Sequence, residues 1–316
     1  MTIHSETTQS PPQAKPAVRA RGGPADRQRT PWEFILPALV PLFLITIGPL
    51  IFLYYISMTD YELGTALSDA RWVGLDNYAR LFSGKDPQFW SAVVNTIWLA
   101  VVATAIELVL GFGIALLVDS FSDRMKGLLV AILMLPMVVT PVIVGLVWKL
   151  MMNSEHGVIN WLLGHFGMRP AWLGPDLSLA SVMIVEVWQW TPFAALILLA
   201  GLSSLPTEPH EAAAIDGASG WQSLIYVTLP LLMPVILLAA LLRLIDVLKI
   251  FDVIFIMTGG GPGSSTETLA IHSYRLGFYF TGWIGRASAT AVVLAILTTA
   301  VAIIMIVRLQ RVYQER

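Results

Sequence analysis

The feature that most constrains this chain is a series of apolar segments, each about as long as a helix that crosses a lipid bilayer. A bilayer core of about 30 Å requires roughly 20 apolar residues in helical conformation. Inside lipid, a helix satisfies its own backbone polar groups. We therefore predict an all-α polytopic integral membrane protein with six transmembrane helices. Their expected ranges are 34–56, 93–118, 128–151, 179–201, 231–257 and 287–307.

The composition agrees with a membrane protein and excludes several other classes. Hydrophobic residues make up 56% of the chain and charged residues 13%, and the mean hydropathy is +0.72. Soluble domains carry about 25% charged residues. The chain has no cysteine, which excludes disulfides and thiolate chemistry. A net charge of −2 without a basic face makes membrane lipid, and not nucleic acid, the expected partner.

The chain divides into a polar tail and a membrane domain. Residues 1–30 are rich in Pro, Gln, Thr and Arg, a composition that buries too little apolar surface to fold, so we predict a disordered cytoplasmic tail. Residues 31–316 form the predicted transmembrane domain. The apolar run 34–56 is longer than the roughly 7–15 residues of a signal-peptide core, and we expect it to be a true span.

The distribution of Lys and Arg predicts that both termini lie in the cytoplasm. These residues are more frequent in the tail, in the loop containing Arg124 and Lys126, and after the last span than in the alternate loops. The loop 203–230 should then be cytoplasmic, although it contains no Lys or Arg. We interpret this absence as a sign that another protein covers the loop.

That loop has the pattern of a short helix followed by a second helical piece. The helix should begin near Thr207–Pro209, where Glu208 and Glu211 suit a first turn, and should end at Gly217. A second short amphipathic piece should run to Pro230. A helix lying on the membrane surface is the general alternative for such a loop.

The residue identities in this loop resemble those of a known family. Glu211-Ala212-Ala213, Asp216-Gly217-Ala218 and Thr228-Leu229-Pro230 resemble the signature loop of permeases in binding-protein-dependent ATP-driven importers. In that family, the short helix enters a groove on a separate ATPase subunit. The resemblance implies an ATPase-coupling surface made of Glu211, Ala212, Ala213, Asp216, Gly217 and Ala218.

Further motifs resemble the carbohydrate branch of this family. They are Leu135-Pro136, Gly157-Val158-Ile159-Asn160, Val187-Trp188 and Pro192-Phe193. Asp252-Val253 and the run after Thr258 resemble the first permease of a maltose-type pair. The resemblance implies the bacterial inner membrane, a second permease, two ATPase copies and a periplasmic or lipid-anchored solute-binding protein. The implied docking residues for that protein are Gly259, Gly260, Gly261 and Pro262.

Charged residues in the fifth predicted span form a second candidate site. Arg243, Asp246, Lys249 and Asp252 are three residues apart and would share a broad helix face. Ionisable residues at membrane depth usually face the bundle interior or a water-filled path. Internal ion pairs that fix packing and the lining of a solute path are both compatible with this spacing. Arg243 would suit an anionic or highly polar solute.

The fourth predicted span combines polar and aromatic residues on one face, a mixture suited to sugars. Carboxylates and amides bind hydroxyl groups, and aromatic rings cover the apolar C–H face of a sugar. The family resemblance adds positions from neighbouring spans. The predicted solute-path residues are Met137, Pro141, Glu186, Gln189, Trp190, Phe193, Arg243, Asp246, Val247, Lys249 and Ile250.

No phosphate-binding loop occurs in the sequence, so we expect no cofactor in this chain, with ATP and Mg bound by the partner ATPase. His210-Glu211 lacks the second histidine of a zinc protease motif. We predict a non-enzymatic permease subunit that imports a sugar, sugar alcohol or anionic sugar derivative by alternating access. A secondary transporter and a membrane enzyme are the alternatives, but the sequence shows no evident internal repeat and no catalytic constellation.

Overall fold

A computed structural model describes residues 32–280 and 282–314. The predicted disordered tail therefore lies outside the described residues. The chain falls into two compact units, Met1–Pro49 and Leu50–Arg316. Of the first unit, residues 32–49 are described and form the start of helix α1, which continues into the second unit as far as Ser57.

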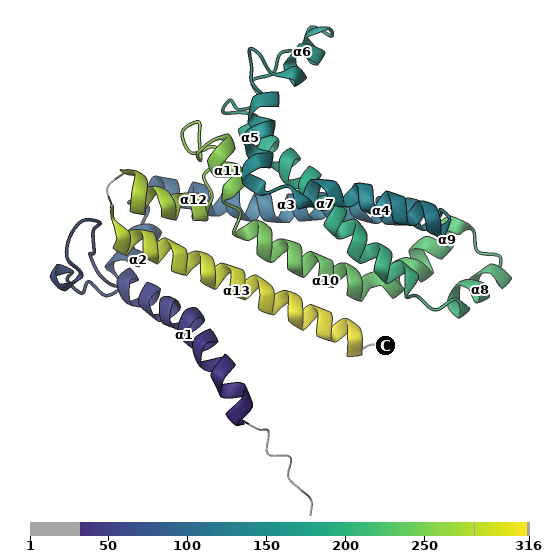
Figure 1. The fold of residues 1–316 in the computed structure, drawn as a ribbon, viewed down its shortest axis with the longest axis horizontal. Coiled ribbons are helices and arrows are strands. Elements are labelled where there is room, and N and C mark those ends of the chain that lie inside the picture. The colour runs from purple at the N-terminus through teal and green to yellow at the C-terminus, as the bar shows by residue number, and fades with distance from the viewer. Residues whose placement is uncertain (1–31, 281, 315–316) are drawn as a thin grey trace, which may run out of the picture. The chain divides into compact units, whose positions relative to one another are not determined.

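The described residues are helical and contain no strand (Figure 1). The only β-pairing among them is an isolated bridge between Thr59 and Trp72. The helices are α1 (Trp32–Ser57), η1 (Leu67–Asp69), α2 (Asp76–Phe82), α3 (Pro87–Asp119), α4 (Asp123–Val138), α5 (Pro141–Met151), α6 (Val158–Gly164), α7 (Ser178–Ser203), α8 (Glu208–Ile215), α9 (Gly220–Ser223), η2 (Leu224–Thr228), α10 (Leu229–Leu248), α11 (Asp252–Met257), α12 (Leu269–Tyr274), η3 (Arg275–Phe280) and α13 (Ile284–Gln314).

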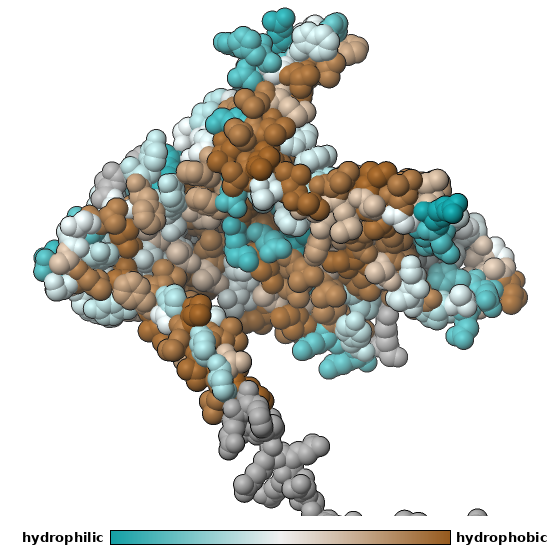
Figure 2. Space-filling view, in the orientation of Figure 1, coloured by the Kyte–Doolittle hydropathy of each residue, from teal (hydrophilic) through white to brown (hydrophobic). Residues whose placement is uncertain are grey.

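Several of these helices are long and apolar enough to span a membrane. Within the described part of the chain there are five, or six if a bent pair of helices is counted as one span. Figure 2 shows apolar residues covering long stretches of the helices, with hydrophilic residues gathered near α6 and α8. The prediction of an all-α polytopic membrane protein is confirmed.

The third predicted span, 128–151, is not one straight helix. It consists of α4 and α5, which meet at an angle of 87°. Thr140 is extended, with φ −63° and ψ 142°, and Pro141 is the first residue of α5. A proline disfavours helical conformation in the residue before it and lacks the N–H group that a continuous helix would use. The prediction of a single helix was wrong because Pro141 breaks it.

The fifth predicted span, 231–257, is also divided. Helical structure begins earlier, at Gly220, and passes through the π-helical turn η2 into α10, which ends at Leu248. Lys249 caps α10, and Asp252 begins the separate helix α11. The four charged residues of the prediction therefore do not share one helix face. No glycine or proline marks this break in the sequence.

Helices α3 and α7 form the central pair of the second unit and pack closely because small residues line their contact. A Cβ atom added to Gly111 would lie 2.9 Å from the Cβ of Ala194 and 2.9 Å from the backbone N of Ala195. Helix α10 packs against both α3 and α7, and α11 packs against α5 and α7. This packing brings polar residues from α3, α7 and α10 together in the interior.

Candidate functional site

A buried ion network joins three helices in the interior of the second unit. Arg243 on α10 donates from Nε to Glu107 Oε2 at 2.7 Å and from NH2 to Glu107 Oε1 at 3.0 Å. The same NH2 donates to Glu186 Oε1 on α7 at 2.7 Å. The Arg243 guanidinium also lies 4.8 Å from the ring centre of Trp190. Asp246 Oδ2 lies 3.9 Å from Arg243 Nη1 and completes the group.

The network is withdrawn from solvent at its centre. The side chains of Arg243 and Glu107 are 1% and 0% exposed, and that of Glu186 is 5% exposed. Two carboxylates therefore share one guanidinium, and charge-assisted hydrogen bonds of this kind are the strong ones in proteins. The positive charge of Arg243 is therefore balanced by carboxylates of the protein itself. Burying such a group is tolerable only while every partner remains in place.

A cavity of about 180 Å³ opens beside this network. It brings together predicted path residues from α5, α7 and α10 and from the break that follows α10. Figure 2 shows a hydrophilic patch interrupting the apolar surface near the end of α10. The lining residues are Pro141, Glu186, Trp190, Arg243, Asp246, Lys249, Ile250, Phe251, Asp252 and Val253.

Four predicted path residues do not line this cavity. Gln189 is buried, and its Nε2 donates to the backbone oxygen of Val139 at the bend between α4 and α5. Val247 is buried in the apolar core. Phe193 packs edge-on to Trp190 with ring centres 6.3 Å apart, and Met137 is half-buried on α4. These residues support the cavity walls or lie outside them.

The break after α10 changes the expected chain of ion pairs. Lys249 Nζ lies 3.8 Å from Asp246 Oδ1, so the first part of the expected series is present. Asp252 lines the cavity from α11, and no ion pair between it and Lys249 is found among the described residues. These charges form ion pairs and also line a cavity, so the role of a solute path remains a prediction.

Glu107, the bidentate partner of Arg243, is not among the residues predicted from the sequence. Glu107 lies on α3, where it is the sole ionisable residue between the two ends of the helix. An acidic residue within an apolar span is costly unless it is paired, and this signal was available in the sequence. Its partner was not, because Glu107 and Arg243 are 136 positions apart.

The predicted loop helix is present as α8, and its end is fixed by backbone hydrogen bonds. Ala218 N donates to Ala213 O at 2.9 Å, and Gly217 N donates to Ala214 O at 3.1 Å. This pair of backbone hydrogen bonds, with Gly217 at φ +77°, is a Schellman motif. The predicted coupling residues Glu211, Ala212, Asp216 and Gly217 are exposed, and Ala213 and Ala218 are partly exposed.

A side-chain contact links α8 to the start of α10. His210 Nε2 lies 3.1 Å from Thr228 Oγ1, and His210 Nδ1 lies 3.2 Å from the backbone oxygen of Pro206. Thr228 ends η2 and directly precedes α10. His210 is not among the predicted site residues, although its side chain connects the loop helix to the residue that precedes α10.

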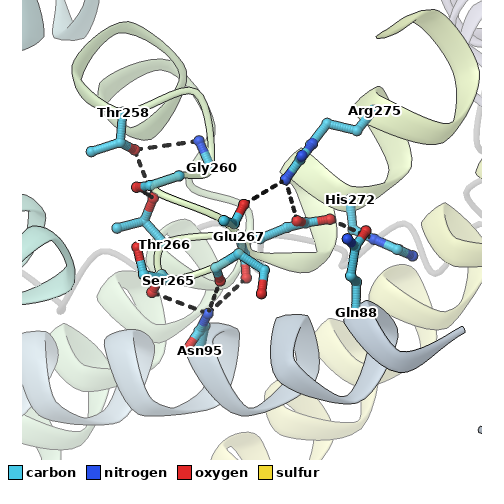
Figure 3. Close-up of polar contacts among 12 residues, drawn as sticks. Gln88, Asn95, Thr258, Gly260, Ser265, Thr266, Glu267, His272 and Arg275 are labelled. Carbon is cyan, nitrogen blue, oxygen red and sulfur yellow. Dashed lines mark hydrogen bonds and ion pairs between the residues drawn. The ribbon is translucent and has the colours of Figure 1, made fainter. Parts of the chain in front are cut away.

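The glycine-rich turn at Gly259, Gly260, Gly261 and Pro262 lies over a buried polar network (Figure 3). Asn95 on α3 donates to three backbone oxygens of the following segment, those of Ser264, Ser265 and Glu267, at 3.0–3.3 Å. Glu267 is fully buried and bonds both His272 Nδ1, at 2.6 Å, and Arg275. The turn is therefore held to α3 and α12 by side chains that the sequence analysis did not single out.

Two acidic residues keep His272 protonated in this network. Burial lowers the pKa of His272, but hydrogen bonds with Asp86 and Glu267 outweigh that effect and raise the pKa from 6.5 to about 9. The hydrogen bond with His272 also lowers the pKa of Asp86, which caps the start of α3. Among the described residues, no group of three or more His, Asp or Glu side chains could hold a metal ion.

Comparison with known proteins gives consistent matches over most of the chain. The profile of the family described as "Binding-protein-dependent transport system inner membrane component" matches residues 107–316. A "Probable ABC transporter permease protein y4oQ" of Sinorhizobium fredii is 40% identical over 96% of this chain and 97% of its own length. The trehalose/maltose transport system permease protein of Thermococcus litoralis is 37% identical over 85% of this chain and 90% of its own length.

A solved structure has the same fold. It is a bacterial ABC transporter involved in the import of the acidic polysaccharide alginate. The match has a TM-score of 0.76 at 23% sequence identity and covers 89% of this chain and 94% of the matched chain.

Proposed function

Because the chain belongs to the family of binding-protein-dependent transport system inner membrane components, we propose that it is the permease subunit of an ATP-driven importer for a neutral sugar. Its 37% identity to a trehalose/maltose permease supports a sugar as the solute. The cavity beside Arg243 supports a polar solute, because it combines charged groups with the ring of Trp190. The permease would move the sugar across the membrane by alternating access.

The observation that carries the importer mechanism is the exposed helix α8. Its Schellman end gives it a defined shape, and it presents small side chains at Ala212, Ala213 and Ala214. Ile215, the last residue of α8, is 86% exposed, and Trp221 in α9 is 70% exposed. Exposed large apolar side chains in a loop between spans are typical of a protein contact. An ATPase subunit is the partner that this surface would bind through Glu211, Ala212, Ala213, Asp216, Gly217 and Ala218.

Movement of α8 would reach the solute cavity through α10. The contact between His210 and Thr228 ties α8 to the residue that precedes α10. Helix α10 carries Arg243, which is bonded to Glu107 on α3 and Glu186 on α7. ATP-driven closure of the partner subunits would therefore displace three helices around the cavity together. The buried hydrogen bonds of the network would hold the three helices in a fixed arrangement during this motion.

The remaining parts of the importer would come from other chains. We place ATP and Mg on two copies of an ATPase subunit, and we expect this chain to hydrolyse no ATP and to need no cofactor. A second, homologous permease would complete the membrane path. A periplasmic or lipid-anchored solute-binding protein would dock at Gly259, Gly260, Gly261 and Pro262. This arrangement requires both termini in the cytoplasm of a bacterial inner membrane.

The geometry favours a neutral over an anionic sugar. Arg243 would have been the natural ligand for an anionic group, but its guanidinium is already bonded by two carboxylates. Asp246 and Asp252 also line the cavity, and Lys249 pairs with Asp246. An anionic solute would therefore meet excess negative charge in a setting of low dielectric constant.

Purification of the tagged chain from its native membrane tests this proposal. We expect an ATPase subunit and a second permease to co-purify with the wild-type chain. A Glu211→Arg variant should lose most of the ATPase while it remains inserted in the membrane with the second permease. Mass spectrometry of the purified complexes gives the ratio of ATPase to permease.

A matched control is available on the same helix. Glu208 is exposed and lies in the first turn of α8, as Glu211 does, but it is outside the proposed contact. Glu208→Arg should therefore retain the ATPase. Equal loss in both variants would indicate a general effect of charge or of helix stability. Equal retention in both would show that α8 does not bind the ATPase.

A further inference from the structure

A second cavity lies beneath the glycine-rich turn, outside the predicted solute path. Its volume is about 300 Å³, which is at the lower end of the range for small-molecule sites. Its walls come from α11, the turn itself, α12 and η3. The lining residues are Phe255, Thr258, Gly259, Gly261, Gly263, Tyr274, Arg275 and Tyr279.

Aromatic rings form one wall of this outer cavity. Phe251 and Phe255 are four residues apart at the start of α11, and their rings stack with centres 5.2 Å apart and planes 14° from parallel. Tyr274, the last residue of α12, packs edge-on against both rings, at 5.4 Å from Phe251 and 5.1 Å from Phe255. The three rings thus fix one another in place across two separate helices.

The same group of rings lies between the outer cavity and the cavity beside Arg243. Phe251 lines the inner cavity, whereas Phe255 and Tyr274 line the outer one. Phe251 and Phe255 stack directly, so a ring that lines one cavity is in contact with a ring that lines the other.

Polar groups also line the outer cavity. The Arg275 side chain is 15% exposed and is held by Glu267 and by the backbone oxygen of Gly263 (Figure 3). The Thr258 hydroxyl bonds Thr266 Oγ1 at 2.7 Å, which fixes the turn over the cavity. Sugars need this combination, because their C–H faces pack on aromatic rings and their hydroxyl groups bond to polar ones.

We propose that the outer cavity is an entry subsite for a neutral sugar, with Phe255 and Tyr274 as its stacking surface. This inference rests on the proposed function and adds to it the site at which the sugar first contacts this chain. The subsite lies beneath Gly259–Pro262, where we place the docked binding protein, so a released sugar would meet these rings before the charged network.

The test uses the assembled importer in proteoliposomes, with ATP inside and sugar-loaded binding protein outside. The probe is radiolabelled maltose or trehalose, whichever the binding protein retains. Phe255→Leu and Tyr274→Leu remove a ring but keep an apolar side chain. We expect each variant to lower the sugar accumulated per ATP hydrolysed by roughly three- to tenfold. Stimulation of ATP hydrolysis by the loaded binding protein should remain, which also shows that the variants are folded.

Two controls separate stacking on sugar from other roles of aromatic residues. Tyr274→Phe keeps the ring and should retain the wild-type ratio of sugar to ATP. Phe278 contacts Tyr274 at 5.5 Å and is 64% exposed, but it lines neither cavity, so Phe278→Leu should also retain that ratio. If Phe278→Leu lowered transport as much as Phe255→Leu, the rings would serve as membrane anchors and the subsite would be refuted.

The remaining outcomes are also decisive. Wild-type ratios in Phe255→Leu and Tyr274→Leu would show that the rings do not handle sugar. Loss of stimulated ATP hydrolysis in these variants would assign the rings to docking of the binding protein, which also overturns the subsite. Failure of the wild-type assembly to accumulate any sugar under ATP would instead refute the proposed function itself.

Discussion

Replacing Arg243 with methionine should strongly destabilise the membrane domain. The change removes three hydrogen bonds and leaves the Glu107 and Glu186 carboxylates buried without their cation. Removing one partner of a buried ion pair costs about 3–5 kcal/mol. For a chain of this size, that cost corresponds to a fall in the unfolding temperature on the order of 10 °C. Thermal unfolding of the detergent-solubilised protein measures the shift.

The same reasoning predicts that removing the whole network costs far less. In the triple variant Glu107→Leu, Glu186→Leu and Arg243→Met, no buried charge is left uncompensated, and such replacements are often neutral or stabilising. Lys249→Met provides a control, because Lys249 is about half exposed and its contact with Asp246 is 3.8 Å long. It should change stability by less than about 1 kcal/mol. An Arg243→Met variant as stable as the wild type would refute the reasoning.

Three further predictions concern packing and the outer network. Gly111→Ala should destabilise the α3–α7 pair by about 1–3 kcal/mol in thermal unfolding, whereas Gly113→Ala, which meets no atom within 4 Å, should be neutral or slightly stabilising. Gly285→Ala should lower the yield of folded protein, because its Cβ would lie 2.1 Å from the backbone oxygen of Thr59. Since the folded-state pKa of His272 is raised from 6.5 to about 9, its stabilising effect is full below pH 6.5 and is lost as the pH rises through 9. Protection factors for amide hydrogen exchange in residues 258–275, which correct for the intrinsic base-catalysed rise of the exchange rate with pH, should therefore fall between these pH values, and His272→Gln should remove most of this fall.

The helices that the sequence predicts well are those in which apolar length alone decides the structure. The fourth span was expected at 179–201, and α7 runs from Ser178 to Ser203. The loop helix was predicted from its cap residues, and α8 ends where Gly217 allows a left-handed backbone. Local chemistry is sufficient in both cases, because the signals lie within a few residues of the element that they define.

The breaks in the spans were harder to predict. Pro141 was visible in the sequence, but the apolar run around it was long enough to suggest one helix. No local signal marks the end of α10 at Leu248. There, the chain turns so that α11 packs against α5, with Gly145 close to Val253 and Ile256. Such a contact depends on long-range packing, which overrides local propensity.

The candidate site was predicted in part for the same reason. Seven of the expected path residues meet at one cavity. The polar ones among them were predictable, because a polar side chain in a span usually faces the interior of the helix bundle. The partner of Arg243 could not be identified, since the pairing with Glu107 depends on how α3 and α10 pack. The stack of Phe251, Phe255 and Tyr274 likewise forms only once α11 and α12 are in place.

Uptake of a labelled sugar by proteoliposomes tests the central claim most directly. The vesicles would contain this chain with its co-purified permease and ATPase, with ATP inside and binding protein with labelled maltose or trehalose outside. We predict accumulation that requires both ATP and the binding protein and that falls to background in the Glu211→Arg variant. Accumulation by this chain alone, without ATP or a partner subunit, would contradict the account and would identify a secondary transporter.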